Sequence, residues 1–326
     1  MMTGVTEVSK PDVLAVAKLH PFYQKALESL YTVHDRTHVT DPAAFASLAA
    51  RIVGVAGTGE ASVPRSLLSQ LPNAKVVAVF GVGYDGVDVQ AAIEHGIPVT
   101  HTPDVLTDDV ADLAMGLVLS VGRAIPQADQ FVRAGQWPNG PMTLGRKVSG
   151  VRLGIVGLGR IGKAIAQRAQ AFGMSIAYTA RTEKKDSGFT FFQTAAALAA
   201  NVDFLVAITP GGAGTKHLIN ADVLKALGPR GFLINVARGS VVDEEALIEA
   251  LQNGTIAGAG LDVFANEPNV PEALWGMHNV VLTPHMASAT TETRQAMADL
   301  AFANMQAGIS GQPLRTPVPE CSGLVK

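Results

Sequence analysis

From residue 51 onward the chain alternates between short apolar runs and longer amphipathic stretches. The runs show little alternation of apolar and polar positions, which is typical of strands buried on both faces. They lie at Arg51–Ala56, Ala74–Phe80, Val151–Val156, Met174–Tyr178, Asp203–Ile208, Gly231–Val236, Ala257–Val263 and Val280–Thr283. Helical stretches between such strands predict right-handed βαβ units in parallel sheets, so we expect an α/β fold.

Two helices can be placed directly from the pattern. Apolar residues recur every three or four positions over Asp104–Arg123, just after Pro103, which predicts a long helix there. A second helix is predicted over Lys163–Phe172, where Gly173 would end it. A length of 326 residues predicts two domains, and we place the first boundary near Pro103.

Three glycines lie between the predicted strand Val151–Val156 and the second helix. Gly157 would permit a tight turn, Gly159 would let the backbone approach a pyrophosphate, and Gly162 would allow close packing of helix on strand. The helix N-terminus then offers N–H groups to the phosphates. We therefore expect a dinucleotide site on the turn formed by Gly157, Leu158, Gly159, Arg160, Ile161 and Gly162.

The next strand end lacks the acidic residue that would hold a ribose 2′-hydroxyl. Ala180, Arg181 and Thr182 stand there instead. A guanidinium can pair with a 2′-phosphate, so we expect NADPH (NADP) to be preferred over NADH. In an alternative interpretation, Arg181 lies on a solvated loop beside a cofactor held by other contacts.

Polar residues follow three later strands, at the edge where an open parallel sheet binds its ligand. Arg238, Glu267 and His285 suit hydride transfer to a ketone: His285 would supply the proton, Glu267 would orient it, and Arg238 would grip a carboxylate. Taken singly, His285 could be a core histidine, Arg238 a helix-cap partner and Glu267 a turn acid.

Composition narrows the function further. A net charge of −3 lacks the excess of basic residues that is typical of nucleic-acid-binding proteins. A single cysteine excludes a disulfide framework and a multi-cysteine zinc site. We expect Cys321 to be an exposed spectator. The first eleven residues lack the apolar region of a signal peptide, and there is no apolar run of about 18 residues. We therefore expect a cytoplasmic protein with no membrane partner.

Four motifs, in matching order and spacing, resemble those of the D-isomer-specific 2-hydroxyacid dehydrogenase family. They are Gly157-Leu-Gly-Arg-Ile-Gly, Asn235-Val-Ala-Arg-Gly-Ser-Val-Val-Asp-Glu, Gly260-Leu-Asp-Val-Phe-Ala-Asn-Glu-Pro and Thr283-Pro-His-Met-Ala-Ser. Gly81-Val-Gly-Tyr-Asp and the segment after Thr102 extend the match, which covers about residues 50 to 300. The first 50 residues carry no recognised motif.

The resemblance implies His285 as acid and base, Glu267 as its partner and Arg238 as substrate clamp, with the backbone at Val82 and Gly83 holding the substrate carboxylate. No metal is expected. Further cofactor contacts are expected at Thr107, Ile208, Thr209, Pro210, Val236, Ala237 and Asp262.

The family implies two doubly wound domains with a cleft between them and a homodimer built on the cofactor domains. Residues 1–103 and 288–326 would form a flavodoxin-like substrate domain, and residues 104–287 a Rossmann dinucleotide domain. Composition alone indicates none of this assembly.

The loop Tyr178-Thr-Ala-Arg resembles that of the NADPH-dependent glyoxylate/hydroxypyruvate reductases, so we expect a small 2-oxo acid to be reduced to the (R)-2-hydroxy acid. The family's formate dehydrogenases carry Gln where this chain has Glu267, which disfavours that branch. Two alternatives stay open: a nucleotide-sensing regulator of the corepressor type, and a dehydrogenase of the same architecture acting on another small anion such as phosphite.

Overall fold

The computed structural model describes residues 10–324, and its contacts divide the chain into two compact units. The first unit comprises the chain up to Leu106 together with the segment from Thr290, and the second comprises Thr107–Ala289. These limits lie within three residues of the expected boundaries after residues 103 and 287. Residues 1–9 and 325–326, which the predicted first domain includes, lie outside the described part.

The first unit is built on a parallel sheet of five strands in the order β2-β1-β3-β4-β5. This is the doubly wound order of flavodoxin-like folds. Its strands are β1 (Asp12–Ala15), β2 (Thr32–Asp35), β3 (Ile52–Thr58), β4 (Val77–Phe80) and β5 (Val99–Thr100). Its helices are α1 (Pro21–Leu30), α2 (Thr37–Thr40), α3 (Pro42–Leu48), α4 (Arg65–Leu68), α5 (Val89–Glu94) and α13 (Thr291–Ser310).

The second unit is built on a parallel sheet of seven strands in the order β12-β11-β10-β9-β6-β7-β8. Its strands are β6 (Arg152–Val156), β7 (Ser175–Thr179), β8 (Thr190–Phe191), β9 (Phe204–Ala207), β10 (Phe232–Asn235), β11 (Gly258–Leu261) and β12 (Val280–Leu282). Its helices are α6 (Thr107–Arg123), α7 (Ile125–Arg133), α8 (Arg160–Ala171), α9 (Ala195–Ala199), α10 (Ala221–Leu227), α11 (Glu244–Gln252) and α12 (Glu272–Trp275).

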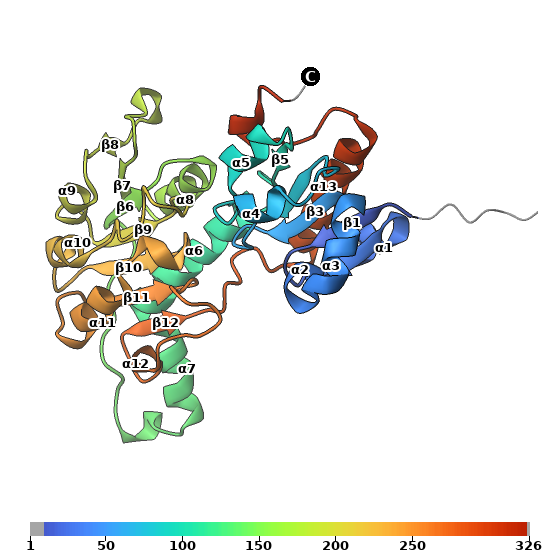
Figure 1. Ribbon diagram of the computed structural model, residues 1–326. Helices are drawn as coiled ribbons and strands as arrows, with labels where there is room; N and C mark the ends of the chain where they lie inside the picture. Colours follow the sequence, from blue (N-terminus) through green and yellow to red (C-terminus); the bar gives the residue numbers. More distant parts are fainter. Residues whose placement is uncertain (1–9, 325–326) are drawn as a thin grey trace, which may run out of the picture. The chain divides into compact units, whose positions relative to one another are not determined.

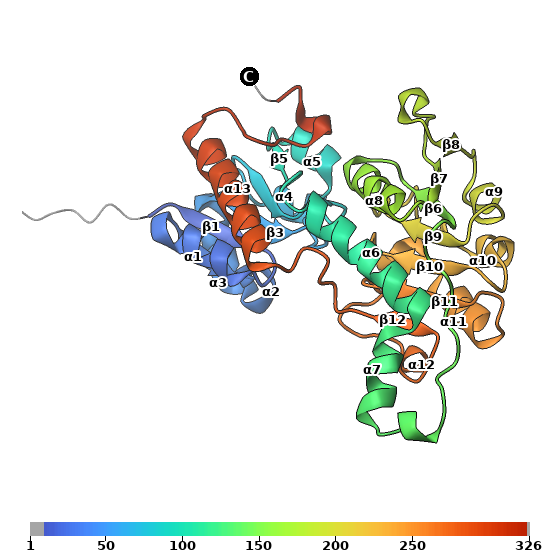
Figure 2. The same ribbon diagram turned by 180° about the vertical axis from the view of Figure 1, so that it is seen from behind.

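Helices cover both faces of each sheet, which explains the unbroken apolar strands (Figures 1 and 2). In the second unit α6 and α8 cover one face, and α9, α10 and α11 the other. In the first unit α1 and α13 pack together on one face, and α3, α4 and α5 contribute to the core on the other. The α/β class with two doubly wound parallel sheets is thus confirmed.

The strand order of the second sheet reverses at β6, because β9 lies on one side of it and β7 on the other. The carboxyl ends of all seven strands share one edge. Such a reversal opens a crevice at the strand ends where ligands bind in open α/β sheets. The turn that begins at Gly157 directly follows β6 and therefore lies at this point.

Several sequence expectations need correction. Helix α6 begins at Thr107, three residues later than predicted, because Asp104 adopts a left-handed backbone with φ of 70°. Helix α8 begins at Arg160, earlier than the predicted Lys163, because Gly159 is its N-cap and its carbonyl accepts the N–H of Lys163 at 3.0 Å. Gly173 does follow the helix, with φ of 68°.

The expectation of an exposed Cys321 is wrong. Its side chain is fully buried in the core of the first unit, where its sulfur accepts the N–H of Val99 at 3.4 Å. Burial raises the pKa of this thiol, so it stays protonated and unreactive. Strands β1, β2 and β5, which the sequence pattern did not predict, complete the same sheet, and β8 of the second sheet was not predicted either. Within residues 10–324, no helix is long and apolar enough to cross a membrane.

Candidate active site

The three glycines after β6 do not serve the same purpose. A side chain on Gly162 would lie 2.2 Å from the carbonyl oxygen of Gly157, and one on Gly157 would lie 2.8 Å from that of Ile208. Both glycines are therefore required by the protein's own packing. A side chain on Gly159 would meet nothing within 4 Å. The protein leaves space in front of Gly159, at the N-cap of α8, which fits a bound phosphate group.

The expected cofactor residues at the neighbouring strand ends lie along the same edge. Ile208, Thr209 and Pro210 follow β9, and Gly157 approaches Ile208 and Thr209 closely. Val236 and Ala237 follow β10 and are buried. Thr107 begins α6, the long helix that packs on β10, β11 and β12. Leu158 is buried, whereas Arg160 is exposed, so a ligand would meet the backbone of Leu158 rather than its side chain.

The loop after β7 is exposed and carries mixed charge. Arg181, Thr182 and Glu183 are exposed, as is Ala180 in part. Lys163 of α8 lines a small pocket together with residues 183–187 of this loop. One hydrogen bond fixes the loop to β7: the Tyr178 hydroxyl accepts the N–H of Lys184 at 2.6 Å. The loop after β7, where the sequence predicts the adenosine ribose, therefore carries lysine and arginine residues together with the acids Glu183 and Asp186.

Arg238 follows β10 on a turn organised by Asn235. The Asn235 amide donates to the carbonyl of Arg238 at 3.1 Å, and its oxygen accepts the N–H of Ala237 at 3.1 Å. The Arg238 guanidinium donates to the carbonyl of Ala237 at 2.8 Å. Asn235 is only 1% exposed, so this polar strand end is a fixed part of the unit. The turn presents Arg238 at the carboxyl edge of the sheet.

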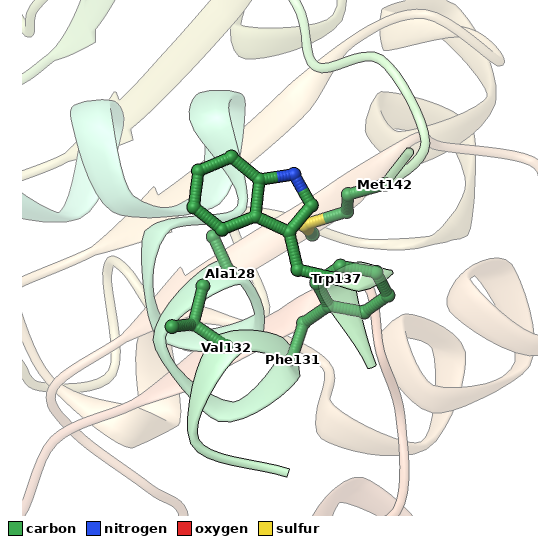
Figure 3. Close-up of a pocket in the computed structure, with 5 residues that line it drawn as sticks. All are labelled: Ala128, Phe131, Val132, Trp137 and Met142. Atoms are coloured by element: carbon green, nitrogen blue, oxygen red, sulfur yellow. The ribbon is translucent and has the colours of Figure 1, made fainter. Parts of the chain in front are cut away.

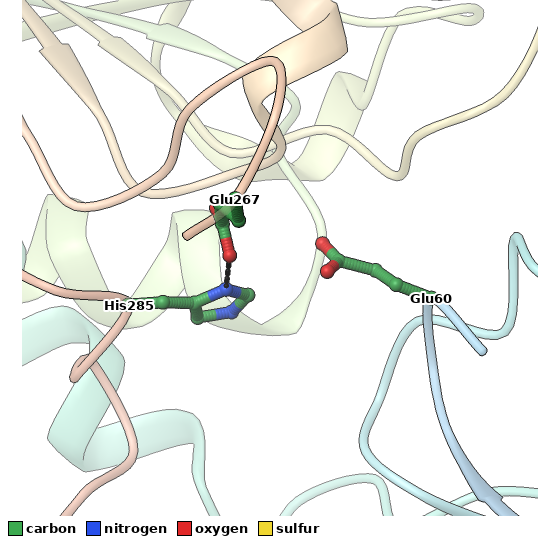
Figure 4. A group of neighbouring side chains, drawn as sticks. All are labelled: Glu60, Glu267 and His285. Carbon is green, nitrogen blue, oxygen red and sulfur yellow. Dashed lines mark hydrogen bonds and ion pairs between the residues drawn. The ribbon is translucent and has the colours of Figure 1, made fainter. Parts of the chain in front are cut away.

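His285 and Glu267 form a direct pair (Figure 4). Nδ1 of His285 lies 2.6 Å from Oε2 of Glu267, and the other carboxylate oxygen accepts the N–H of Phe264 at 3.0 Å. Burial pushes the pKa of Glu267 up, but the hydrogen bonds from His285 and Phe264 and the charge of Arg238 outweigh it and hold the pKa below its usual value. Glu267 is therefore a carboxylate, which can only accept.

This pairing fixes the roles of the two ring nitrogens. Because Glu267 can only accept, Nδ1 carries a proton and Nε2 is the atom left to exchange one. The side chain of His285 is 39% exposed and that of Glu267 is 21% exposed. The imidazole can therefore be reached by a ligand, while the carboxylate behind it is more deeply placed.

Asp262 organises the loop that carries His285. Its carboxylate is fully buried and accepts hydrogen bonds from the hydroxyl of Thr283 at 2.6 Å and from the N–H groups of Met286 and Ala287 at 2.8 and 2.9 Å. The backbone of His285 is left-handed, with φ of 51°, which is uncommon for a residue other than glycine. Burial raises the pKa of Asp262 against these hydrogen bonds. The expected cofactor contact at Asp262 thus coincides with a side chain that the loop already uses.

The expected substrate residues Val82 and Gly83 follow β4 in the first unit. The carbonyl of Val82 accepts a hydrogen bond from Nδ1 of His101 at 2.8 Å, and the carbonyl of Gly81 accepts one from the N–H of Thr102 at 2.8 Å. The ring of Tyr84 packs edge-on against that of His101. The first part of the loop after β4 is therefore fixed within its own unit.

Comparison with known proteins places these features in one family. The model of the NAD binding domain of D-isomer specific 2-hydroxyacid dehydrogenases matches residues 115–287. A hydroxyphenylpyruvate reductase of Plectranthus scutellarioides is 46% identical over 309 residues, which are 94% of this chain and 98% of that protein. The chain belongs to the D-isomer specific 2-hydroxyacid dehydrogenase family.

Two other members of the family are similar over most of their length. Glyoxylate/hydroxypyruvate reductase A of Arabidopsis thaliana is 49% identical over 267 residues, 82% of this chain and 85% of its own. The crystal structure of an NADPH-dependent glyoxylate/hydroxypyruvate reductase of Sinorhizobium meliloti, in complex with NADP and malonate, has a TM-score of 0.88 at 48% identity. It covers 96% of this chain and 98% of its own.

As a member of the 2-hydroxyacid dehydrogenase family, the chain is an NAD(P)-dependent oxidoreductase that interconverts 2-oxo acids and D-2-hydroxy acids. The matched segment lies within the second unit, so the glycine turn after β6 belongs to an NAD(P)-binding domain. This agrees with the free space in front of Gly159.

Some residues that shape this dehydrogenase site were not predicted from the sequence. Asn235 organises the Arg238 turn, and Thr283 completes the contacts of Asp262. Both could have been found, because each is a polar residue that ends an otherwise apolar strand. Glu244, whose carboxylate accepts the N–H of Ala265 at 3.1 Å, is the last residue of the motif that begins at Asn235, and nothing in its sequence context marks it.

Proposed function

We propose that this dehydrogenase reduces small 2-oxo acids of the glyoxylate and hydroxypyruvate type to 2-hydroxy acids, of (R) configuration where the product is chiral, and prefers NADPH. The observation that carries the proposal is the hydrogen-bonded pair of Glu267 and His285 on the sheet edge that also holds Arg238 and the glycine turn. The reductases of Arabidopsis and Sinorhizobium meliloti, which act on these acids, support the substrate class. A cytoplasmic location, expected from the sequence, is part of the proposal.

The chemistry follows from the atoms available. The cofactor, when bound, supplies a hydride to the carbonyl carbon. His285 gives its Nε2 proton to the carbonyl oxygen, so that the ketone becomes an alcohol and the imidazole becomes neutral. Glu267 stabilises the imidazolium before this transfer and keeps Nε2 facing the substrate. Arg238 binds the substrate carboxylate and polarises the adjacent carbonyl. The family resemblance also implies a carboxylate contact for the backbone at Val82 and Gly83 of the first unit.

The residues around the glycine turn would hold the dinucleotide. Leu158 to Gly162 would bind its pyrophosphate through backbone N–H groups. The strand-end residues Ile208 to Pro210, Val236 and Ala237, together with Thr107 and Asp262, would line the remainder of the cofactor. Arg181 and Thr182 would contact the 2′-phosphate.

The preference for NADPH rests on the end of β7. Ala180 stands where a carboxylate would accept the ribose 2′-hydroxyl and repel a phosphate. Arg181, Lys184 and Lys163 supply positive charge there, and the exposed acids Glu183 and Asp186 oppose it. The loop is exposed, so water screens each ion pair and we expect a preference of about tenfold or more rather than an absolute one.

A substrate panel tests the proposal. Oxidation of NADPH and NADH is followed with glyoxylate, hydroxypyruvate, an aryl pyruvate and a sugar-derived 2-oxo acid, and reduction of NADP is followed with phosphite. We expect the highest kcat/KM for glyoxylate or hydroxypyruvate with NADPH. A higher value for the aryl pyruvate would overturn the substrate class, and equal use of NADH would overturn the cofactor preference. Turnover of none of the acids would favour a nucleotide-sensing regulator.

We further propose that the enzyme is a homodimer formed through the second unit. Helix α7 has no buried residue, and the segment after it exposes large apolar side chains, with Trp137 68% exposed and Leu144 95% exposed. Ala128, Phe131, Val132, Trp137 and Met142 line a pocket on this segment (Figure 3). Such a contiguous apolar surface is typical of a protein interface, and the family expectation makes a second copy its occupant.

Light scattering after size-exclusion chromatography tests the dimer. The wild type should have the mass of two chains, and Leu144→Glu or Val132→Glu should shift it towards one. Leu30→Glu, which places the same charge at a 46% exposed leucine of α1 in the first unit, is the control and should stay dimeric. A monomeric wild type would overturn the proposal.

A further inference from the structure

We propose that Glu244 is a positioning residue for the acid–base pair: it holds the turn 264–267 in place, and through that turn Glu267 and His285. The inference rests on the catalytic roles proposed above for these two residues. Glu244 itself would touch neither substrate nor cofactor.

The first observation is a hydrogen bond between two elements far apart in sequence. Oε2 of Glu244 accepts the backbone N–H of Ala265 at 3.1 Å. Glu244 is the first residue of α11, and its own position is fixed because Asp243 caps the helix by accepting the N–H of Ala246 at 3.2 Å. A rigid helix end therefore holds one point of the turn.

The second observation is that the next N–H in the same turn already belongs to the catalytic pair. Phe264 donates to Oε1 of Glu267 at 3.0 Å, and Oε2 of Glu267 accepts from His285 at 2.6 Å. Adjacent backbone donors are thus divided between two carboxylates, one that holds the turn and one that acts on the imidazole. A displacement of the turn moves Glu267 relative to His285.

The third observation is a close backbone contact between the Arg238 turn and the Glu267 turn. A side chain on Gly239 would lie 1.9 Å from the carbonyl carbon of Phe264, so the two backbones touch there. Gly239 follows Arg238 directly, and a short 3-10 turn, Gly239–Val241, leads from it towards α11. The turn that presents Arg238, the helix end that carries Glu244 and the turn of Glu267 therefore form one packed unit.

Two charged groups other than Glu244 bear on the pair of Glu267 and His285 within the second unit. Asp262 interacts with His285 and holds its loop, and the charge of Arg238 acts on Glu267. Glu244 acts on none of these side chains directly, because its described contact is to a backbone N–H. Its contribution is geometric, and its removal should change how well Glu267 supports the imidazolium.

The test compares Glu244→Ala, Glu244→Gln and Glu245→Ala in the full-length enzyme. Glu245 is the matched control, since it lies in the same first turn of α11 and carries the same charge but is exposed. For Glu244→Ala we expect kcat for reduction to fall about three- to tenfold, with little change in the KM for NADPH. Glu244→Gln keeps an acceptor oxygen and should recover most of the activity, and Glu245→Ala should match the wild type.

A pH readout separates positioning from a general loss of stability. Reduction needs the imidazolium, and a well-placed Glu267 favours it, so the pH above which kcat falls should move down by about half a unit in Glu244→Ala. NMR titration of the His285 imidazole, assigned with His285→Ala, should show the same shift. Because this titration needs no turnover, it decides the inference even if the wild type reduces none of the acids and the proposed function fails.

The inference is overturned if Glu244→Ala has the wild-type kcat and His285 titration. It is also overturned if Glu245→Ala shifts the titration equally, because the effect would then be one of helix charge. It is overturned as well if Glu244→Gln, which keeps an acceptor oxygen, has the same kcat and His285 titration as Glu244→Ala. If Glu244→Ala fails to fold, Glu244→Asp replaces it in the test. Its side chain is one methylene too short to reach Ala265, so we expect the same downward shift in the pH at which His285 titrates.

Discussion

Two halves of the second sheet's carboxyl edge are built in different ways. At the ends of β10, β11 and β12, buried or half-buried polar groups already have partners: Asn235 holds the Arg238 turn, Asp262 holds the His285 loop, and Glu267 holds His285. At the ends of β6 and β7, a glycine turn leaves open space and a charged loop is exposed.

With the roles proposed above, the difference separates two tasks. Proton transfer needs a donor held at a fixed place and angle, so its side chains are fixed before any ligand arrives. The cofactor site, in contrast, gains its partners only when the cofactor binds, because the negatively charged phosphates then pair with the N–H groups and the cationic side chains. The catalytic half should therefore tolerate little change, while the nucleotide half should change its preference gradually.

The sharpest probe of the catalytic half is His285→Ala. Removing the proton donor should lower kcat by about 10²–10⁴-fold, while the Kd for NADPH, measured by fluorescence titration, stays within a few fold. A comparable loss of cofactor binding would mean that the two halves are not separate. Near-normal turnover would contradict the role of His285.

Arg238→Lys probes the same half through geometry rather than charge. Lysine keeps the cation but loses the planar fork, so carboxylate orientation and carbonyl polarisation both suffer. We expect kcat/KM for the 2-oxo acid to fall about 10- to 100-fold, with a melting curve close to that of the wild type. Intact catalysis, or loss of activity only through unfolding, would refute the clamp.

Paired glycine variants divide the nucleotide half into structural and binding positions. Gly159→Ala adds a methyl group into open space on an extended backbone, so the Tm should stay unchanged while the Kd for NADPH rises about tenfold. Gly162→Ala places a methyl group against the carbonyl of Gly157 and should destabilise the fold by about 1–3 kcal/mol. Normal NADPH binding by Gly159→Ala would show that the turn does not approach the phosphates.

Substitutions in the exposed loop after β7 should change the cofactor preference gradually. Arg181→Ala should weaken the use of NADPH about three- to tenfold without affecting NADH, and Ala180→Asp should move the preference towards NADH. Arg230→Ala is the control, since this exposed arginine precedes β10 at the opposite edge of the sheet. The measurement is kcat/KM for both cofactors. An equal loss with NADH would argue against a 2′-phosphate contact.

The smallest expected effect concerns the pH dependence of stability. The pKa of Glu267 in the folded state lies below its ordinary value of 4.5, so its interactions stabilise the fold above that pH and lose their effect as the pH falls through the lower folded value. Urea unfolding should therefore show wild type and Glu267→Gln differing at neutral pH and converging in acid. A constant difference between them across this range would show that the carboxylate charge is not what stabilises the pair.

Some of this structure was open to prediction because it depends on local pattern. The eight apolar runs became strands, since a strand covered by helices on both faces must be apolar throughout. Arg238, Glu267 and His285 could be singled out as candidates because each follows such a strand and parallel strands end at a common edge, and the family resemblance of their motifs supplied their expected roles. The glycine turn could be assigned because its spacing reflects steric limits within one short segment.

Other features depend on residues that meet only in the folded chain. Four strands were not predicted: β1, β2, β5 and β8. β5 and β8 are only two residues long and β2 is partly exposed, so none of these three shows the longer apolar run of a strand covered on both faces. Cys321 is buried because the chain returns from α13 to the core beside β5, which the sequence near the cysteine does not show.

The fold class and the dinucleotide turn could be predicted from the amino-acid sequence, because they depend on periodicity and on the stereochemistry of a short segment. The strand ends and the family resemblance of their motifs marked Arg238, Glu267 and His285 as candidates. The folded structure was needed to show that Nδ1 of His285 faces Glu267, that Asp262 supports the His285 loop and that Glu244 accepts a hydrogen bond from the turn of Glu267. These contacts join strand ends and a helix end that lie 18 to 24 residues apart in sequence. Hydrogen bonds of this kind depend on distances within a few tenths of an ångström, which are fixed by packing of the whole unit and not by any local pattern.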